Sequence, residues 1–434
     1  MEPLFPVFFD RIMSPTYHFG GLSYGNLHSM TNESFISYPK KAALQSLKKM
    51  NLLREYGLNQ YVIPPQLRNY KVILRQMGFD GNFKNALKAV FKSDLQLLSS
   101  IFSGSASWVA NSFVLTSSND SLDNNVHITP ANLVTCFHRQ LEVSDTIKTL
   151  KYLFPNRAHF SLHDTVPNSF SDEGAANMIR LSGDSKIGLY IFVYGKVSTV
   201  TPKIDFPVRQ SKEAFEYIAR HHKLKSNQFL FAQQSAKAIE QGVFHNDVIC
   251  FGTSNCLVIH EDAFENQDAV LDIISKQYEE LFAKPLIIYQ IPSNQLTLQQ
   301  AVKTYFFNSQ FVNLNSNQML LICPTLCKDN ITIQSCIRDL EQRFSKELIV
   351  CYTDLSESIK NGGGPACLRG FAYLSQTEID LINKKYLLTD KLYQRLKTTI
   401  MNLYPDKLNF EELILEEKIN SFQNTTKAIL KLFN

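Results

Sequence analysis

The segment Asn-Gly-Gly-Gly-Pro-Ala-Cys-Leu-Arg at residues 361–369 is the most informative stretch of this sequence, because it places a cysteine after a rigid bend and before an apolar run. Three glycines make positive φ angles available and let the backbone approach a bound ligand, since no Cβ stands in the way. Most Gly-rich turns are only turns, and most buried thiols only pack. Cys367 therefore needs partners elsewhere in the chain before it indicates chemistry.

A second segment, Gly242–Val248, supplies such partners. His245 and Asp247 are two residues apart, so on an extended segment both side chains would lie on one face. A thiol, an imidazole and carboxylates are the groups that thiolate catalysis requires. A lone histidine before a strand is more often structural, which is the alternative for His245.

Apolar runs and helical patterns alternate along the chain, which predicts an α/β fold. The polar stretch 117–125 is expected to be one surface loop, and no Pro/Gly/Ser-rich linker divides the chain, so residues 1–434 are expected to form one domain. Buried strands are predicted at 187–194, 248–251, 257–259, 286–291, 319–323 and 348–352. Helices are predicted at 211–222, 270–281, 332–344 and 391–403, with Ser211 as an N-cap.

Composition and charge narrow the class of protein. The net charge of +4 is spread along the sequence without long basic blocks, so the sequence gives no sign of a nucleic-acid-binding surface. The N-terminus has no signal-peptide pattern, and no apolar run approaches the roughly 18 residues of a membrane span, so we expect a soluble, cytoplasmic protein. Eight cysteines in 434 residues are too few for a disulfide framework, so reduced thiols are expected.

Eight segments together resemble the N-succinylarginine dihydrolase family, bacterial enzymes of arginine breakdown within the guanidine-modifying superfamily. The resemblance implies the pentein fold, a five-bladed α/β propeller of ββαβ modules around a central active site. Asn111, Glu173 and His245 are spaced at about one polar residue per such module. The eight segments are 19–26, 128–133, 137–139, 172–177, 231–234, 244–247, 307–310 and 361–367.

The resemblance implies a role for each catalytic residue. Cys367 matches the nucleophile, whose thiolate would be favoured by the cationic substrate and a nearby imidazolium. His245 matches the general acid/base that protonates departing ammonia and then activates water. Glu173 matches the carboxylate that orients His245; a carboxylate in the first turn of a helix is the structural alternative.

The resemblance also implies the substrate-binding positions. Asp247 and Asn111 match residues that contact the guanidinium, and relatives such as the deiminases carry an aspartate at the Asn111 position. The two carboxylates of the substrate require arginine or N–H donors, although Arg209 has a surface ion pair as its alternative. Residues 20–29 are placed to close over the ligand as a lid. The remaining matched positions are Gly20, Gly21, Leu22, Ser23, Tyr24, Gly25, Asn26, Leu27, His28, Ser29, His138, Arg139, Arg209 and Asn361.

Other signals carry less weight. Cys323 and Cys327 have loose metal-ligand spacing without a second pair, so no metal is expected, and no phosphate-binding loop indicates a nucleotide cofactor. The pair His221-His222 is expected to be solvated. The family pattern departs at Arg11 and Ser14, where glycines are usual, and at Gly20, where alanine is usual; these changes put the local turn geometry in doubt.

The sequence therefore predicts a cysteine hydrolase that converts N2-succinyl-L-arginine to N2-succinyl-L-ornithine, two ammonia and carbon dioxide, without a cofactor. A homodimer is implied by the resemblance alone. One alternative is an arginine deiminase-like enzyme that stops at the citrulline stage. Another is a non-catalytic ligand-binding protein of the same fold.

Overall fold

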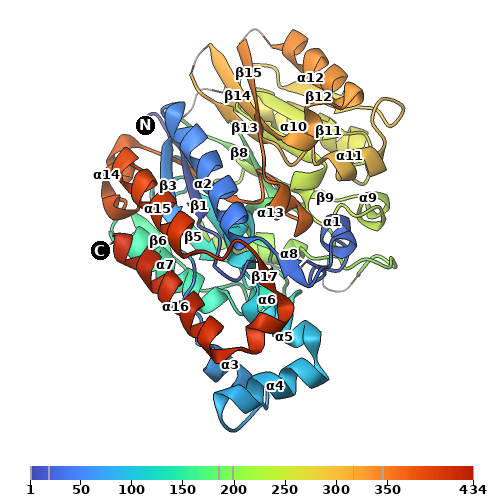
Figure 1. Cartoon of the computed structure of the whole chain (residues 1–434). Helices are drawn as coiled ribbons and strands as arrows, with labels where there is room; N and C mark the ends of the chain where they lie inside the picture. The colour runs from blue at the N-terminus through green and yellow to red at the C-terminus, as the bar shows by residue number, and fades with distance from the viewer. Residues whose placement is uncertain are drawn as a thin grey trace.

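The computed structural model describes residues 2–17, 20–183, 186–197, 200–315, 317–344 and 347–433. Within these ranges, five three-stranded sheets share one topology (Figure 1). In each sheet the middle strand pairs antiparallel with one neighbour and parallel with the other. A parallel pair needs a long crossover connection, and a helix lies in each one. Each unit is therefore a ββαβ module.

Four modules are continuous in sequence. Their central strands are almost wholly buried, which explains why three of them read as apolar runs in the sequence; the remaining one, in the second module, carries His127 and Thr129 and was not predicted. The second module contains β4 (Phe113–Thr116), β5 (Val126–Pro130), α7 (Val143–Leu153) and β6 (Phe160–Leu162). The third contains β7 (Met178–Leu181), β8 (Leu189–Tyr194), α8 (Lys212–His221) and β9 (Phe229–Gln233). The fourth contains β10 (Cys250–Thr253), β11 (Cys256–His260), α10 (Gln267–Phe282) and β12 (Ile287–Ile291). The fifth contains β13 (Gln310–Asn313), β14 (Gln318–Pro324), α12 (Ile331–Arg343) and β15 (Glu347–Thr353).

The first module joins the two ends of the chain. β1 (Phe5–Arg11) is its middle strand, with β16 (Arg369–Leu374) antiparallel on one side and β3 (Asn59–Ile63) parallel on the other. The crossover helix is α2 (Pro39–Glu55), and α15 (Asp390–Leu403) packs against it. This closure brings the segment that carries Cys367 next to the N-terminal strand.

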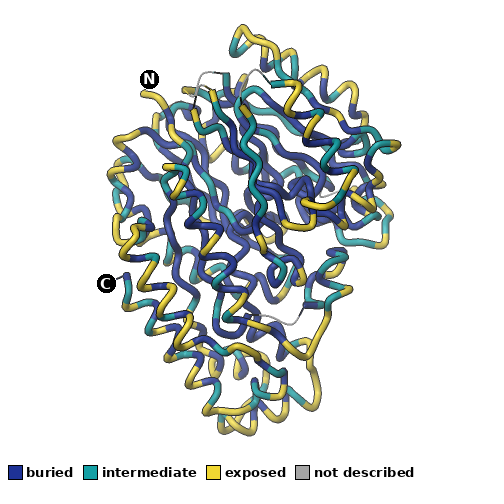
Figure 2. Tube along the Cα trace, turned by 45° about the horizontal axis from the view of Figure 1, so that its top comes forward, coloured by how far each residue is buried: buried dark blue, intermediate teal, exposed yellow. Residues whose placement is uncertain are grey.

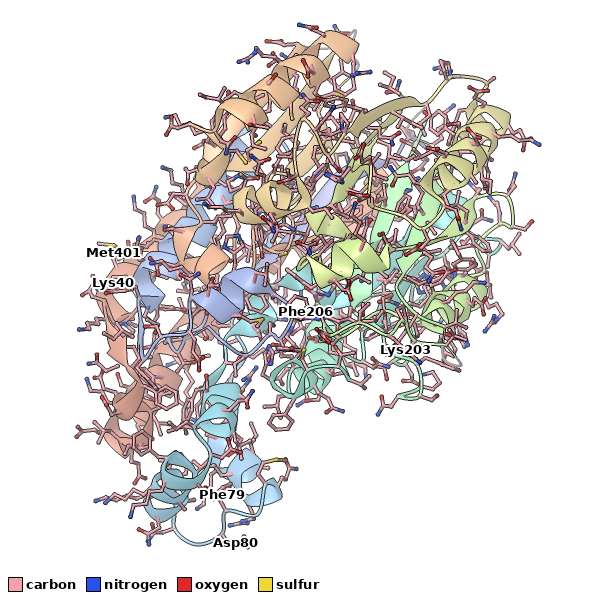
Figure 3. All side chains as sticks on the ribbon, turned by 90° about the vertical axis from the view of Figure 1, so that its right-hand side faces the viewer. Lys40, Phe79, Asp80, Lys203, Phe206 and Met401 are labelled. Atoms are coloured by element: carbon pink, nitrogen blue, oxygen red, sulfur yellow. The ribbon has the colours of Figure 1, made fainter. Side chains whose placement is uncertain are left out.

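A helical segment extends beyond the modules. It consists of α3 (Tyr70–Gln76), α4 (Phe83–Ser93) and α5 (Leu95–Phe102), and it packs on the C-terminal α16 (Glu416–Leu430) through an apolar cluster. Phe79 and Asp80 lie at its far tip (Figure 3). The remaining short elements are α1 (Leu27–Thr31), α6 (Phe137–Gln140), α9 (Ala236–Glu240), α11 (Leu298–Thr304), α13 (Ser356–Lys360), α14 (Gln376–Leu381) and the strand pair β2 (Ile36–Ser37) and β17 (Leu408–Asn409).

Burial follows this layering, with the middle strands of the sheets mostly buried, the last strands of four modules mostly half-buried, and the outer faces of the helices exposed (Figure 2). The predicted α/β class is confirmed, and the predicted helices are confirmed within one residue at each end, except that α10 begins three residues earlier than predicted. Ser211 occupies the N-cap position of α8, but its hydroxyl donates to the backbone carbonyl of Ser171 instead of capping the helix.

Two surface predictions were wrong in part. Most of residues 117–121 are buried, because Asp120 accepts hydrogen bonds from Arg180 at 3.0 Å and Tyr190 at 2.8 Å inside the fold, whereas residues 122–125 are partly or fully exposed, as predicted. His222 is fully buried instead of solvated, between the hydroxyls of Thr116 and Thr129. Both polar side chains are accommodated because their hydrogen bonds are satisfied internally.

Among the described residues, no helix combines the length and apolar character needed to cross a bilayer.

Candidate active site

Five short turns supply the buried polar residues of the site, and each precedes the strand that begins or completes a module. The two turns predicted to carry Glu173 and His245 lie 72 residues apart, and Asn111 lies 62 residues before Glu173. Two further turns continue this spacing, at Asn308 and Cys367, which are 59 residues apart. The five turns precede β4, β7, β10, β13 and β16 respectively.

Cys367 is buried, and its Sγ touches two polar side chains. The Nδ2 of Asn308 donates to Sγ at 3.2 Å, and the thiol lies 3.7 Å from Oδ2 of Asp247. Burial raises the pKa of the thiol well above its usual range, and the Asp247 carboxylate raises it further. Both effects favour the neutral thiol in the free protein, and a positive charge beside Sγ would favour the thiolate.

The three glycines at 362–364 leave room for neighbouring side chains of the site, because they have no Cβ. Gly362 has φ +97°, and a Cβ there would overlap the amide of Asn26. A Cβ on Gly363 would overlap the indole of Trp108, and one on Gly364 would press against Asn308. The sequence predicted a close approach of ligand at these glycines, whereas the structure shows close packing of three site side chains.

His245 and Glu173 form a buried pair. The Nε2 of His245 lies 3.1 Å from Oε2 of Glu173, and the Nδ2 of Asn111 lies 3.2 Å from the same imidazole nitrogen. Thr135 donates a short hydrogen bond to the other Glu173 oxygen. Burial acts to raise the pKa of Glu173, but its contacts with His245, the Arg209 charge and Thr135 outweigh burial and lower it to about 2. Glu173 is therefore an ionised carboxylate that can hold a protonated imidazole.

One carboxylate oxygen of Asp247 accepts no hydrogen bond from the described residues. Its Oδ1 is buried and has no hydrogen-bond partner within the described part of the chain. Burial raises the pKa of Asp247, against the opposing charges of His245 and Arg369. A buried carboxylate oxygen without a donor is a suitable acceptor for a cationic N–H group of a ligand.

Arg209 is buried, so the surface ion pair is excluded as its explanation. Its guanidinium donates to the backbone carbonyl of Tyr24 at 2.7 Å and lies 5.2 Å from the centre of the Phe244 ring. Among the described residues no carboxylate forms an ion pair with it, and its Nε has no hydrogen-bond partner. Phe206, whose ring packs edge-on against Tyr24, lies on the same segment (Figure 3). Arg209 thus retains charge and a donor for an anionic ligand group.

Arg139 is less available to bind a ligand than the sequence predicted. Its Nε donates to Oε2 of the buried Glu142 at 3.1 Å, and its guanidinium lies 5.6 Å from the centre of the Trp108 ring. His138, also buried, precedes it on α6. Arg139 therefore already has a carboxylate partner in this structure.

The loop at residues 20–29 is hydrogen-bonded to the turn that carries Cys367. Asn361 Oδ1 accepts from the backbone N–H of Gly20 at 2.8 Å, and Asn26 Nδ2 donates to the carbonyl of Gly362 at 2.9 Å. Asn26 also caps α1 by accepting from the N–H of Ser29. The Nε2 of His28 lies 3.0 Å from the carbonyl oxygen of Val302, away from residues 361–362. The hydrogen bonds to Asn361 and Gly362 hold the loop against the turn that carries Cys367.

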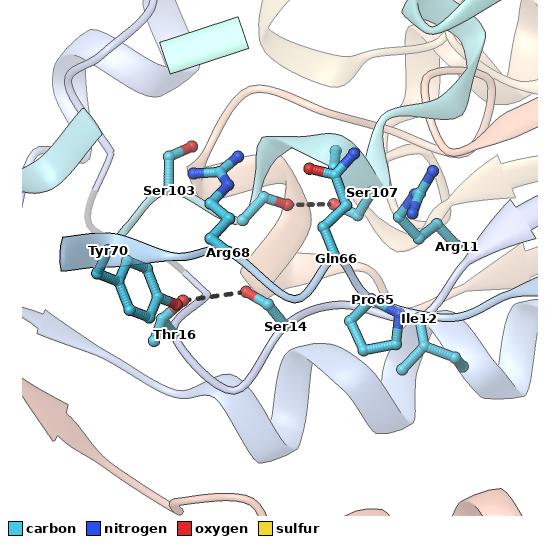
Figure 4. A pocket seen from close by; sticks show the side chains of 12 residues that line it. Arg11, Ile12, Ser14, Thr16, Pro65, Gln66, Arg68, Tyr70, Ser103 and Ser107 are labelled. Atoms are coloured by element: carbon cyan, nitrogen blue, oxygen red, sulfur yellow. Dashed lines mark hydrogen bonds between the residues drawn. The ribbon is translucent and has the colours of Figure 1, made fainter. Parts of the chain in front are cut away.

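The departures from the family pattern are accommodated without backbone strain at two positions. Arg11 and Ser14 line a small pocket beside Arg68 (Figure 4), and neither has a left-handed backbone. Arg11 donates to the carbonyl of Pro64 at 2.9 Å, and burial lowers its pKa to about 10. Gly20 is different: it has φ +65°, and a Cβ there would lie 2.6 Å from the carbonyl oxygen of Asn32. The loop of this chain therefore requires glycine where alanine is usual.

Three residues of the site were missed by sequence reasoning. Asn308 was noticed only within the matched segment 307–310. Gln210 accepts from the N–H of Glu173 at 2.8 Å, and Thr135 bonds the Glu173 carboxylate. Neither has a local sequence signal, because both act through residues distant in sequence.

No group of three or more potential metal ligands occurs among the described residues. Cys327 donates to the carbonyl of Thr304 at 3.5 Å and is buried. The arrangement instead combines a buried thiol, an imidazole held by an ionised carboxylate and a second carboxylate beside the sulfur. These are the groups for nucleophilic attack on a cationic carbon centre.

Comparisons with known proteins agree with this chemistry. A family model described as succinylarginine dihydrolase matches residues 4–434. A protein of Pseudoalteromonas translucida named N-succinylarginine dihydrolase is 38% identical over 437 residues, covering 98% of this chain and 97% of its own length. The Shewanella oneidensis protein of the same name is 39% identical over 411 residues, covering 93% and 92%.

Among solved structures, the chain is similar to the apo form of an arginine dihydrolase from the ornithine–ammonia cycle in cyanobacteria. The TM-score is 0.52 at 12% identity, and the match covers 84% of this chain and 40% of that chain. At so low an identity the similarity shows a shared fold.

Proposed function

The chain belongs to the succinylarginine dihydrolase family, as its motifs predicted, and from that premise we propose that it converts N2-succinyl-L-arginine to N2-succinyl-L-ornithine, two ammonia and carbon dioxide. One observation carries the proposal. His245, held by Glu173 at 3.1 Å, lies on the same buried turn as Asp247, and Asp247 lies 3.7 Å from Cys367 Sγ.

The first round removes one nitrogen. The guanidinium of the substrate supplies the positive charge that Cys367 lacks in the free protein, and its N–H groups donate to Asp247. Cys367 gives its proton to His245, the thiolate attacks the guanidinium carbon, and His245 passes the proton to the departing ammonia. His245 then takes a proton from water, which attacks the amidino carbon and displaces Cys367. The product of this round is a ureido compound, N2-succinylcitrulline.

The second round acts on the retained ureido group. Cys367 attacks its carbon, a second ammonia departs with a proton from His245, and a carbamoyl thioester remains. Water hydrolyses this thioester to an N-carboxylate, which loses carbon dioxide and leaves the amine of succinylornithine. Asn111 suits retention of the ureido group, because an amide donates to a carbonyl oxygen and accepts from an N–H group, whereas a carboxylate repels that oxygen.

The remaining predicted contacts belong to the same proposal. Arg209 is the best placed of the basic residues to bind a substrate carboxylate, because it is buried without a carboxylate partner in the described chain. We assign His138, Arg139 and Asn361 to the same end of the ligand. Residues 20–29 cover it, and their hydrogen bonds to Asn361 and Gly362 support that placement.

We also propose that the five ββαβ modules form one catalytic domain arranged as a five-bladed propeller. Contacts between the first strands support this arrangement: β7 lies beside β10, and β10 lies beside β13. A homodimer in the cytoplasm is part of the proposal on the basis of family resemblance. Light scattering of the purified protein tests the dimer.

The stoichiometry of ammonia tests the proposed reaction. We expect two ammonia per succinylornithine, no accumulation of succinylcitrulline and no use of free arginine. Asn111→Asp should shift the product toward succinylcitrulline, with Ser112→Ala, a change of the next residue, as the control. One ammonia per substrate consumed would indicate a deiminase, and absence of turnover would indicate a binding protein.

A further inference from the structure

Asn308 uses both ends of its side-chain amide on the turn that carries the nucleophile. Its Nδ2 donates to Cys367 Sγ at 3.2 Å and to the carbonyl of Asp247 at 3.0 Å. Its Oδ1 accepts from the backbone N–H of Cys367 at 3.3 Å. The residue is wholly buried, and its own carbonyl accepts from the N–H of Ala366 at 2.9 Å.

We propose that Asn308 is a catalytic residue, the side-chain donor that holds Sγ of Cys367 in place and stabilises its thiolate during attack. This inference rests on the proposed function, in which Cys367 is the nucleophile. Sγ has two polar side-chain neighbours in the described chain, and they act in opposite senses. The Asp247 carboxylate repels a thiolate, whereas the N–H of Asn308 stabilises one.

The burial of the thiol makes this donor important. Removal from water and the Asp247 carboxylate both raise the pKa of Cys367, and the opposing contributions come from the N–H of Gly364, the Asn308 amide and the Arg369 charge. Of these, Asn308 is the side-chain hydrogen-bond donor to Sγ. In a site shielded from water, a single donor to a developing charge has a large effect on the rate.

The geometry also separates a chemical role from a structural one. Asn308→Asp preserves size and the Oδ1 acceptor for the N–H of Cys367, but it replaces the donor to Sγ and to the Asp247 carbonyl with a second carboxylate oxygen; Asn308→Ala loses the same two donor contacts without adding a charge. Gly364 packs directly against Asn308, so a larger substitution such as glutamine would disturb the turn. Ser309→Ala is the matched control, because Ser309 is equally buried in the same turn and donates to the carbonyl of Phe306, away from Sγ.

The experiment measures alkylation of Cys367 by iodoacetamide between pH 7 and 10 without substrate. The Cys367 peptide is quantified by mass spectrometry, because Cys136 and Cys351 are partly exposed and would also react. We expect Asn308→Asp to slow alkylation at pH 8.5 at least about tenfold, and Asn308→Ala to slow it less. Ser309→Ala should match wild type. In turnover, kcat of Asn308→Asp should fall about a hundredfold or more, with KM changed little.

An alkylation profile of Asn308→Asp equal to that of wild type, in a protein with an unchanged circular dichroism spectrum, would overturn the role of Asn308. A Ser309→Ala variant as slow as Asn308→Asp would also overturn it, by showing that the turn alone matters. If Cys367→Ala retained turnover, the proposed function would fail at its nucleophile. The two failures are therefore distinguishable.

Discussion

Two buried histidines of this protein have opposite surroundings. His245 faces the Glu173 carboxylate at 3.1 Å, whereas His222 lies between the hydroxyls of Thr116 and Thr129 at 2.9 and 2.8 Å. The His222 ring also stacks on two further imidazoles, His127 and His163, with ring centres 5.5 and 5.3 Å away. We refer to His127, His163 and His222 as the histidine stack.

The difference decides which imidazole can carry a proton. A carboxylate compensates the charge of a protonated ring, whereas hydroxyls and neighbouring imidazoles do not. Burial lowers the pKa of His222 well below its usual value, and charge on His127 or His163 would lower it further. His222 is therefore held neutral as part of the scaffold, while His245 is equipped for proton transfer. Burial alone does not distinguish a catalytic histidine from a structural one.

The largest expected effect is at Cys367, the proposed nucleophile. Cys367→Ala should abolish turnover, at least about a thousandfold, because covalent catalysis contributes several kcal/mol. Ligand binding and the unfolding transition should change little, since alanine follows the turn without strain. Ammonia release measures turnover, and calorimetric titration with N2-succinyl-L-arginine measures binding. Residual activity above about a thousandth of wild type would contradict the nucleophilic role.

Replacing each of the two histidines with alanine tests this comparison directly. His245→Ala should lower kcat about a thousandfold and leave the free energy of unfolding within about 1 kcal/mol, because Glu173 keeps Thr135 and Asn111 as donors. His222→Ala should do the reverse, costing about 2–4 kcal/mol of stability through a cavity and two unpaired hydroxyls, with kcat close to wild type. If His245→Ala raised only KM, its acid/base role would be wrong.

Two buried arginines extend the comparison. Arg209→Ala should cost about 2–4 kcal/mol in kcat/KM, because a substrate carboxylate would be left unpaired in the site. Arg180, paired with buried Asp120 at 3.0 Å, is the matched control. Arg180→Ala should instead lower stability by about 3–5 kcal/mol, since it leaves a buried carboxylate without its partner. An unchanged kcat/KM for Arg209→Ala would remove Arg209 from the binding site.

The smallest expected effect is the acid response of the histidine stack. Burial lowers the pKa of His163 to about 4, whereas an unfolded histidine titrates near 6.5. The unfolded chain therefore binds more protons than the folded one as pH falls through 6.5, so this residue makes stability decrease from there toward pH 4. The slope from one proton is at most about 1.4 kcal/mol per pH unit.

Urea unfolding at pH 7, 6 and 5 measures this slope. Asp172 opposes the trend, because burial raises its pKa to about 7, so the informative quantity is the difference between wild type and His163→Gln. The variant should show a smaller loss of stability toward pH 5. Equal slopes in the two proteins would show that His163 titrates normally in the folded state.

The strands and helices that were predicted correctly follow from local sequence patterns. The run Met319–Cys323 lies within β14, and the apolar stripe from Val270 to Leu281 lies within α10, because strand and helix periodicity depend on neighbouring residues. The prediction for β10 was shifted by two residues. It began at Val248, which instead ends the short turn that presents His245 and Asp247. The prediction was wrong at the residues that form the turn of the candidate site.

The sequence by itself determined the family, the α/β class and the residue types of the chemistry, because motifs such as 361–367 and 244–247 are contiguous. Only the tertiary structure decided which side chains meet. Asn308 reaches the sulfur of Cys367 from 59 residues away, Arg139 is already paired with Glu142, and His222 is buried. These outcomes depend on how modules pack against one another, and a polar residue has the same local signal whether its partner is water, a distant carboxylate or a nucleophile.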